Sequence, residues 1–163
     1  MRKLLLAACV AALGCGQAQS GSLPAPAGVS AIEHDVVEAV NRYRVEHGLP
    51  MLRPNARIAT VARRHSEAAA RGETRLSDGQ GRLRARAVSV SMPVQTWAED
   101  VVEGHVFDAD PAPQLSAMLV AAARAHLETA AFEDVGVGVA RDSHGRYYLT
   151  QLLILSRAGY QRP

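Results

Sequence analysis

Residues 132–155 read FEDVGVGVARDSHGRYYLTQLLIL, and this stretch decides the fold. Its first half alternates valine with small residues, which predicts a strand with one branched apolar face and one face almost without side chains. The small positions are Gly136, Gly138 and Ala140. Because glycine has no Cβ, another backbone or a helix can approach such a face closely. We therefore expect a helix to pack against it.

The second half of the stretch predicts the turn and the return strand of a hairpin. Asp142 suits the first position of a turn, and Gly145 supplies the positive φ that re-enters the return strand. Residues 147–155 are apolar on both faces apart from Thr150 and Gln151. Apolar residues on both faces predict a covered, central strand.

The residues before the hairpin predict three helices and one further strand. Ser30 and Glu33 have the spacing of a capping box at the start of the first helix. Asn55 is a candidate N-cap for the second helix, and the third is expected over residues 114–130. The apolar stripe of the first helix comprises Ile32, Val36, Val37, Val40 and Tyr43. The apolar face of the second comprises Ile58, Val61, Ala62, His65 and Ala69.

The order of these elements indicates the fold class. A strand is expected over residues 95–102 and a loop over 103–113, whereas 73–86 gives no clear assignment. Helix, helix, strand, helix and hairpin is an α+β order. We expect a small antiparallel sheet covered by helices, in one domain over residues 31–163.

The N-terminus has the form of a secretory leader. Arg2 and Lys3 precede an apolar run, 4–13, that is too short to span a membrane. The chain has two cysteines, Cys9 and Cys15, and both lie in this segment. We expect residues 1–15 to be a lipoprotein-type signal peptide with lipidation at Cys15. Cleavage at Cys9, or ordinary cleavage after Ala18, are the alternatives.

The segment after the leader predicts a tether. Residues 16–30 contain mainly Gly, Ser, Gln, Pro and Ala, so we expect a flexible linker with little to bury. We then expect the protein to be secreted across the inner membrane and anchored by lipid in the bacterial cell envelope, with no other membrane contact. The mature domain has no cysteine left for a disulfide.

The charge of the mature chain gives no reason to expect nucleic-acid binding. The full sequence has 18 basic and 16 acidic residues, a net charge of +2. Removing Arg2 and Lys3 leaves 16 of each, because 18 − 2 = 16. The local run Arg82, Arg84 and Arg86 has no aromatic residues between its members, so we interpret it as a solvated face.

Five segments in order resemble the CAP superfamily. This is the SCP-like domain of cysteine-rich secretory proteins, antigen 5 and plant pathogenesis-related proteins, and the chain is most similar to its disulfide-free bacterial branch. The resemblance covers about residues 31–155 and implies an α-β-α sandwich with a cleft on one side. The segments are residues 37–52, the helix after Asn55, Ala98-Glu-Asp-Val101, Val135–Ala140 and Gly145–Gln151.

The resemblance also implies which residues line the cleft. In the family, this cleft can hold two histidines and one or two glutamates, which in some members bind zinc. Glu99 matches the glutamate of the Ala-Glu motif, and His126 is the candidate for the histidine of the third helix. Asp78 stands where the family has its other histidine. These three residues are an incomplete ligand set, so the expected cofactor is none and zinc is disfavoured.

The other polar residues have simpler interpretations. His65 lies on the apolar stripe of the second helix and either points into the cleft or is a hydrogen-bonded, partly buried histidine. His34 and Glu38 have i, i+4 spacing on a polar face. The loop cluster of His105, Asp108 and Asp110 lacks the pattern of a calcium loop. Ser66 and Ser77 have no evident base.

These observations support three readings of function. The first is a non-enzymatic binding module, expected to be monomeric, that takes a small ligand or an envelope component in a degenerate cleft lined by Glu99, His126, Asp78 and His65. In that reading Glu99 and His126 form a polar pair. The second is a hydrolase or metal-binding domain that uses the same Glu99 and His126. The third is a structural protein of the cell envelope.

Overall fold

The computed structural model describes residues 29–75 and 94–156 of the chain. The leader and most of the expected tether, Asp78 and the Arg82–Arg86 run lie outside these ranges. The helices and strands within these ranges are, in chain order, α1 (Val29–Glu46), β1 (Arg53–Pro54), α2 (Ala56–Ala70), β2 (Val94–His105), α4 (Ala112–Leu127), β3 (Asp134–Arg141) and β4 (Arg146–Ser156).

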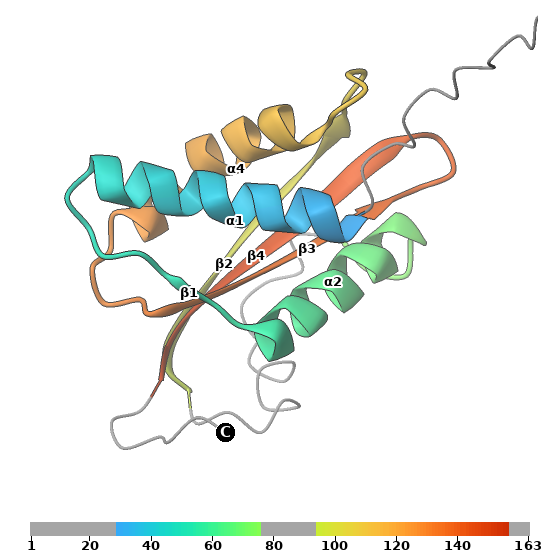
Figure 1. Cartoon of the computed structure of the whole chain (residues 1–163). Coiled ribbons are helices and arrows are strands. Elements are labelled where there is room, and N and C mark those ends of the chain that lie inside the picture. Colours follow the sequence, from blue (N-terminus) through green and yellow to red (C-terminus); the bar gives the residue numbers. More distant parts are fainter. Residues whose placement is uncertain (1–28, 76–93, 157–163) are drawn as a thin grey trace, which may run out of the picture.

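The strands form one sheet in the order β1-β3-β4-β2 (Figure 1). β4 pairs antiparallel with both β3 and β2 and is therefore central, which confirms the prediction from its apolar faces. The two-residue β1 pairs parallel with β3, so the sheet is mixed rather than purely antiparallel. β1 was not predicted, because two residues carry no periodicity.

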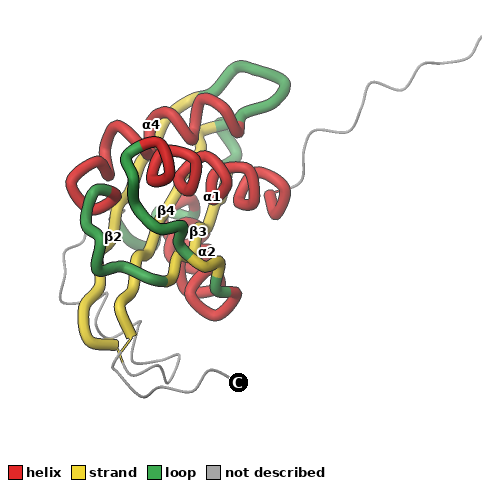
Figure 2. The backbone as a smooth tube through the Cα atoms, turned by 60° about the vertical axis from the view of Figure 1, so that its left-hand side comes forward, coloured by secondary structure: helices red, strands yellow, loops and turns green. Residues whose placement is uncertain are grey.

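Helices cover both faces of this sheet, as expected for an α-β-α sandwich. In Figure 2 the strands β2, β4 and β3 follow one another, with α1 and α4 in front of them and α2 behind. The valines of β3 pack with α1 and α4 in one cluster that contains Val36, Leu119 and Leu153. A second cluster joins Ile58 of α2 to Leu152 of β4. The apolar side chains of β4 alternate between the two faces of the sheet, so β4 contributes to both hydrophobic clusters.

The small face of β3 receives α2, as the sequence predicted. A Cβ built on Gly136 would clash with the backbone of Ile58 and Ala59, and one on Gly138 with the backbone of Ala62 and Arg63. Ser66 of α2 also donates a hydrogen bond to the carbonyl of Gly138, at 2.9 Å. The absence of side chains on β3 thus sets the distance between the helix and the sheet.

The capping box predicted at Ser30 and Glu33 is wrong. α1 is described from Val29, which places Ser30 inside the helix rather than at its N-cap. Glu33 is 6% exposed, and its carboxylate accepts hydrogen bonds from the guanidinium of Arg63 and from the amide of Val139. Glu33 therefore links α1 to α2 and to β3. Its carboxylate bonds Arg63 and Val139 and not the backbone amides at the start of α1.

Two polar residues of α1 fix the chain that follows the helix. The side chain of Asn41 both donates to and accepts from the backbone of Leu52, at 3.0 and 2.8 Å. Arg44 is fully buried, and its guanidinium donates to the carbonyls of Pro50, Leu127 and Thr129 at 2.8–3.1 Å. These bonds place β1 beside β3 and attach the C-terminal end of α4 to α1.

The hairpin turn has the predicted chemistry. The carboxylate of Asp142 accepts hydrogen bonds from the amides of His144 and Arg146, each at 2.9 Å, and from the hydroxyl of Tyr148 at 3.2 Å. Gly145 has a φ of +86°. The amide bonds, that from Arg146 above all, hold the pKa of the Asp142 carboxyl below its ordinary value.

Asn55 is the N-cap of α2, as predicted, because its side chain accepts from the amides of Arg57 and Ile58. β2 is longer than the expected strand over residues 95–102, and α4 begins at Ala112 and ends at Leu127 rather than covering 114–130. Within residues 29–75 and 94–156, none of the helices combines the length and hydropathy that a membrane span requires.

Candidate functional site

Strand β2 presents two consecutive acids to opposite faces of the sheet. Glu99 lies opposite Leu152 in the register, and Asp100 lies opposite Gln151. Because successive side chains of a strand alternate, the two carboxylates point away from each other. Glu99 therefore faces α2, and Asp100 faces α4. Each carboxylate contacts a histidine of the helix that covers its face of the sheet.

The first pair is buried beneath α2. The Nδ1 atom of His65 lies 3.2 Å from Glu99 Oε1 and 3.2 Å from the hydroxyl of Thr150. His65 is 3% exposed, because it lies on the apolar stripe of α2. The same ring nitrogen thus contacts both a carboxylate of β2 and a hydroxyl of β4.

A line of hydroxyls continues from this pair into the sheet. The hydroxyls of Thr150 and Ser66 lie 2.9 Å apart, and Ser66 donates to the carbonyl of Gly138. The Ser66 hydroxyl therefore has both the Gly138 carbonyl and the Thr150 hydroxyl within donating distance, and Thr150 links it to His65. His65 is thus the hydrogen-bonded, buried histidine that was one of its two predicted roles. Its Nε2 atom is buried and has no hydrogen-bond partner among the described residues.

The second pair lies beneath α4 and reaches the surface. His126, in the last turn of α4, places Nδ1 at 2.7 Å from Asp100 Oδ1. The other oxygen of Asp100 accepts from the side-chain amide of Gln151 at 3.0 Å. The side chain of Asp100 is 7% exposed, whereas that of His126 is 43% exposed. A buried carboxylate thus fixes one nitrogen of a half-exposed imidazole, which suits the ring to anchor a ligand or to accept a proton.

The expected pairing of Glu99 with His126 is wrong. The sheet separates these two side chains, and each is bonded to a residue that the sequence interpretation did not assign to it. Asp78, the third candidate, lies outside the described residues. Within residues 29–75 and 94–156, no three His, Cys, Asp or Glu side chains are grouped closely enough to hold a metal ion.

Sequence signals for the correct partners were present. Thr150 and Gln151 were the two polar exceptions in an otherwise apolar strand, and they are the residues that bond His65 and Asp100. Asp100 was not among the candidates, because the resemblance to the family pointed to its neighbour Glu99. Alternation along β2 would have placed the two acids on different faces.

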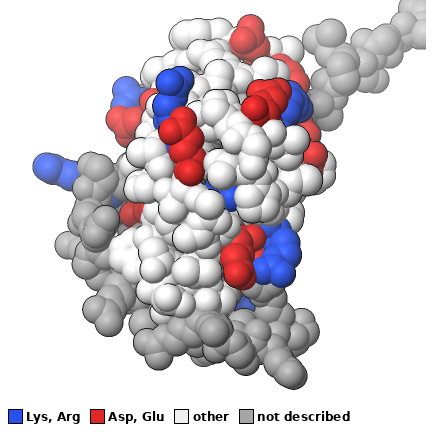
Figure 3. Space-filling view, turned by 90° about the vertical axis from the view of Figure 1, so that its left-hand side faces the viewer, with Lys and Arg blue, Asp and Glu red and all other residues white. Residues whose placement is uncertain are grey.

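The remaining predicted polar residues lie elsewhere on the surface. His34 contacts Asp35 at 3.5 Å, and no His34–Glu38 bond is found in the described part of the chain. His105 ends β2, and its ring lies 6.2 Å from that of Phe107, which is 92% exposed. On the face shown in Figure 3, acidic and basic side chains lie close together rather than in large patches of one sign.

Two cavities lie away from both carboxylate–histidine pairs. One, of about 680 Å³, is bordered by the end of α2 and the β3–β4 turn, with Arg71, His144 and Tyr148 in its lining. The other, of about 340 Å³, lies between α1 and the start of α4. The described residues that line them include neither His65 nor His126.

Solved structures with the same fold come from bacteria. The chain is similar to a cysteine-rich secretory protein of Staphylococcus aureus (22% identity, TM-score 0.58, 77% of this chain and 38% of that one). It is also similar to an extracellular, SCP-domain protein of Bacillus anthracis (24%, 0.62, 83% and 45%). A third is an outer surface protein of Borrelia burgdorferi (10%, 0.64, 80% and 97%). The chain thus spans less than half of the first two proteins.

Sequence comparison identifies the family. No curated protein matches the chain significantly. The model of the CAP family, described as the cysteine-rich secretory protein family, matches residues 37–153. This range begins in α1 and ends in β4, so it contains most of the sheet and both carboxylate–histidine pairs. The chain belongs to the cysteine-rich secretory protein (CAP) family.

Proposed function

We propose that this protein is an extracytoplasmic CAP domain that binds a ligand or an envelope component without catalysing a reaction. The observation that supports the proposal is the separation of Glu99 and His126 by the sheet. A combined acid–base or metal site made from these two side chains would need them on one face. The half-exposed His126, fixed by Asp100, is the polar anchor of the binding surface.

The contacts of His126 suit an anchor better than a catalytic base. Its partner Asp100 is buried and bonded to Gln151, so this carboxylate positions the ring and does not itself reach a ligand. No hydroxyl or thiol in the described ranges is hydrogen-bonded to His126. The ring therefore has no side-chain nucleophile there to activate for covalent catalysis. A binding site needs only shape and a few convergent polar groups.

The proposed location is the cell envelope. Residues 1–15 have the pattern of a lipoprotein signal peptide, with Cys15 as the lipidated residue and the segment to Ser30 as a tether. Two proteins of similar fold are described as extracellular or as an outer surface protein, which fits this proposal.

Two assays on the purified mature protein test the absence of catalysis and of a metal site. Isothermal calorimetry with zinc is expected to show no stoichiometric binding to the wild-type protein. His126→Ala is therefore expected to give the same result. A panel of ester and peptide substrates is expected to show no turnover that depends on His126. Tight zinc binding lost in His126→Ala, or His126-dependent turnover, contradicts the proposal.

One observation favours hydrolysis as a second candidate. The 2.7 Å bond between His126 and Asp100 has the geometry of an imidazole oriented as a general base. Hydrolysis through this pair predicts that His126→Ala and Asp100→Asn each lower turnover by orders of magnitude. His144→Ala is the matched control, because His144 is exposed in the hairpin turn. Equal activity in all four proteins excludes this candidate.

A further inference from the structure

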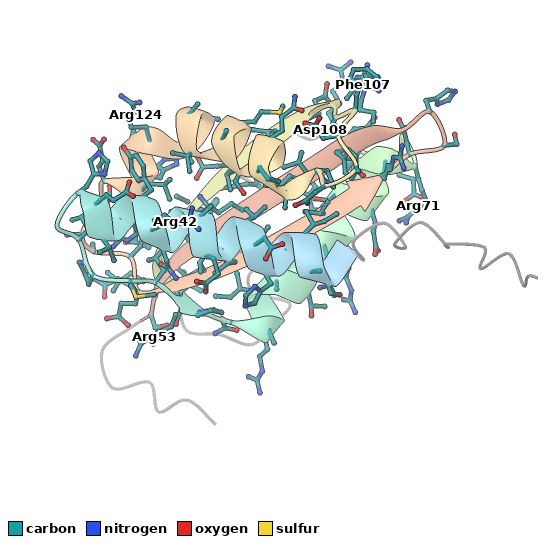
Figure 4. All side chains as sticks on the ribbon, turned by 45° about the horizontal axis from the view of Figure 1, so that its top comes forward. Arg42, Arg53, Arg71, Phe107, Asp108 and Arg124 are labelled. Atoms are coloured by element: carbon teal, nitrogen blue, oxygen red, sulfur yellow. The ribbon has the colours of Figure 1, made fainter. Side chains whose placement is uncertain are left out.

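The cavity of about 340 Å³ between α1 and α4 is lined by charged side chains. α1 contributes Asp35, Glu38 and Arg42, and the segment before α4 contributes Asp110. Figure 4 labels Arg42 on α1, beside α4. The volume lies in the lower part of the range for small-ligand pockets, roughly 300–1,000 Å³. The cavity therefore suits a small group rather than a large ligand.

A largely buried serine also lines this cavity. Ser116 of α4 is 7% exposed. Thr60 and Thr129, which also occupy helical or helix-end positions, donate to the carbonyl four residues earlier at 2.9 and 3.0 Å. Ser116 has no such bond, nor any other hydrogen bond within the described ranges. Its hydroxyl is thus free to bond a group that enters the cavity.

The charges around the cavity favour a cation. Three carboxylates face one guanidinium. Asp110 uses one oxygen to accept from the amide of Ala112 at 3.1 Å, and Asp35 contacts His34 at 3.5 Å, so each has an oxygen left. Glu38 has no ion-pair partner in the part of the chain that the structure describes. An incoming positive group would supply that partner.

The spacing of the acids favours an organic cation over a metal ion. Asp35, Glu38 and Asp110 are all described residues, and they do not form a group of three that could hold a metal. An ammonium group has three donors on a flexible stem and accepts looser geometry than metal coordination. A hydroxyl oxygen such as that of Ser116 is an acceptor for one of these donors.

We propose that this cavity between α1 and α4 binds an alkylammonium group. Glu38, Asp110 and Asp35 supply negative charge, and Ser116 supplies a hydroxyl acceptor. A free amine and a lysine side chain share this chemistry. The cavity is separate from His126 and Asp100, so the proposal does not depend on their role. Arg42 lies one helical turn after Glu38 and lowers the affinity of the site, because its guanidinium repels the bound cation.

The test uses two probes and the purified mature protein at low ionic strength, where charge interactions are least screened. Cadaverine represents free amines, and N-acetyl-lysine methylamide represents a lysine side chain without charged termini. Binding is followed by NMR shifts of α1 and α4 amides and quantified by titration. Binding of either probe in this cavity supports the proposal, and their relative affinities show which source fits better.

Variants of the lining give the result a distinctive pattern. Glu38→Gln is expected to weaken binding about fivefold or more, and Ser116→Ala about threefold, since each removes one charged or polar contact. Arg42→Gln is expected to strengthen binding, because it removes a like charge. Glu46→Gln, at an exposed acid of α1 that does not line the cavity, is the matched control and should leave the affinity unchanged.

Two results would overturn the proposal. One is the absence of shifts around this cavity with both probes. The other is binding that Glu38→Gln, Ser116→Ala and Glu46→Gln change equally, since general attraction to acidic residues would give that pattern. The variants alter one exposed or small side chain each, and their melting temperatures show whether the fold is intact.

Discussion

Glu99 and Asp100 are adjacent in the chain, yet their carboxylates lie on opposite faces of the sheet, one against His65 and the other against His126. The first pair is enclosed by α2, and the second reaches the surface beside α4. The two carboxylate–histidine pairs built on β2 are therefore separate from each other. The buried pair joins α2 to β2 and β4, whereas the half-exposed pair is the one that can meet a ligand.

The close approach of α2 to β3 predicts a large effect of a single methyl group. Gly138→Ala should lower the free energy of unfolding by about 3 kcal/mol, because its Cβ meets the backbone of Ala62 and Arg63, which cannot move aside without shifting the helix. Gly104→Ala is the control, since its Cβ would meet only the flexible end of Met118. Urea denaturation measures both. Equal stability of the two variants would contradict the packing described here.

The buried guanidinium of Arg44 predicts a second stability effect. Arg44→Met should cost about 3 kcal/mol or more, because it leaves the carbonyls of Pro50, Leu127 and Thr129 without this donor. Arg42→Met, at an exposed position on the same helix, should change stability by about 0.5 kcal/mol or less. Urea denaturation of both variants checks the difference. A similar cost at the two positions would argue against the bonds of Arg44.

Local patterns predicted the elements of the fold but not the contacts that depend on its assembly. The small residues of β3 alternate with valine, and β4 is an apolar run that is typical of a strand covered on both faces. β1 has two residues and exists because Asn41 and β3 hold it in place. Glu33 had the spacing of a cap, but its partners Arg63 and Val139 are 30 and 106 residues away in the sequence.

The candidate site was predicted less well for a related reason. His65, Glu99 and His126 were selected from the sequence as candidate cleft residues, but their pairing depends on which helix covers which face. Alternation shows that Glu99 and Asp100 diverge. It does not show that α4 lies on the side of Asp100, since that follows from the register and from the path of the chain between elements.

The depressed pKa of Asp142 predicts an acid-dependent loss of stability. A carboxyl whose pKa is lower in the folded state stabilises the protein above its unfolded value, about 3.9 for Asp, and this stabilisation is lost as the pH falls through the folded value. Asp142→Asn removes the titrating group. Thermal melts between about pH 2 and pH 6 should therefore show a shallower decline below about pH 4 for the variant. An identical decline would mean that Asp142 contributes nothing to it.

The proposed lipid anchor predicts a change of location. Cys15→Ser should release the mature protein from the membrane fraction or leave an unprocessed precursor there, because acyl chains hold the protein by burial of their methylenes. Cys9→Ser should alter neither processing nor location. Fractionation of cells that express each variant, with mass spectrometry of the mature N-terminus, checks this. An unmodified N-terminus at Gln19 would show ordinary secretion.

The separation of the two carboxylate–histidine pairs is tested most directly by two double-mutant cycles on unfolding free energy. Asp100→Asn with His126→Ala is expected to give an interaction energy of about 1 kcal/mol, because these residues share a hydrogen bond. Glu99→Gln with His126→Ala is expected to be additive to within about 0.5 kcal/mol. An interaction of 1 kcal/mol or more, as a rough threshold, between Glu99 and His126, with none between Asp100 and His126, would contradict this account.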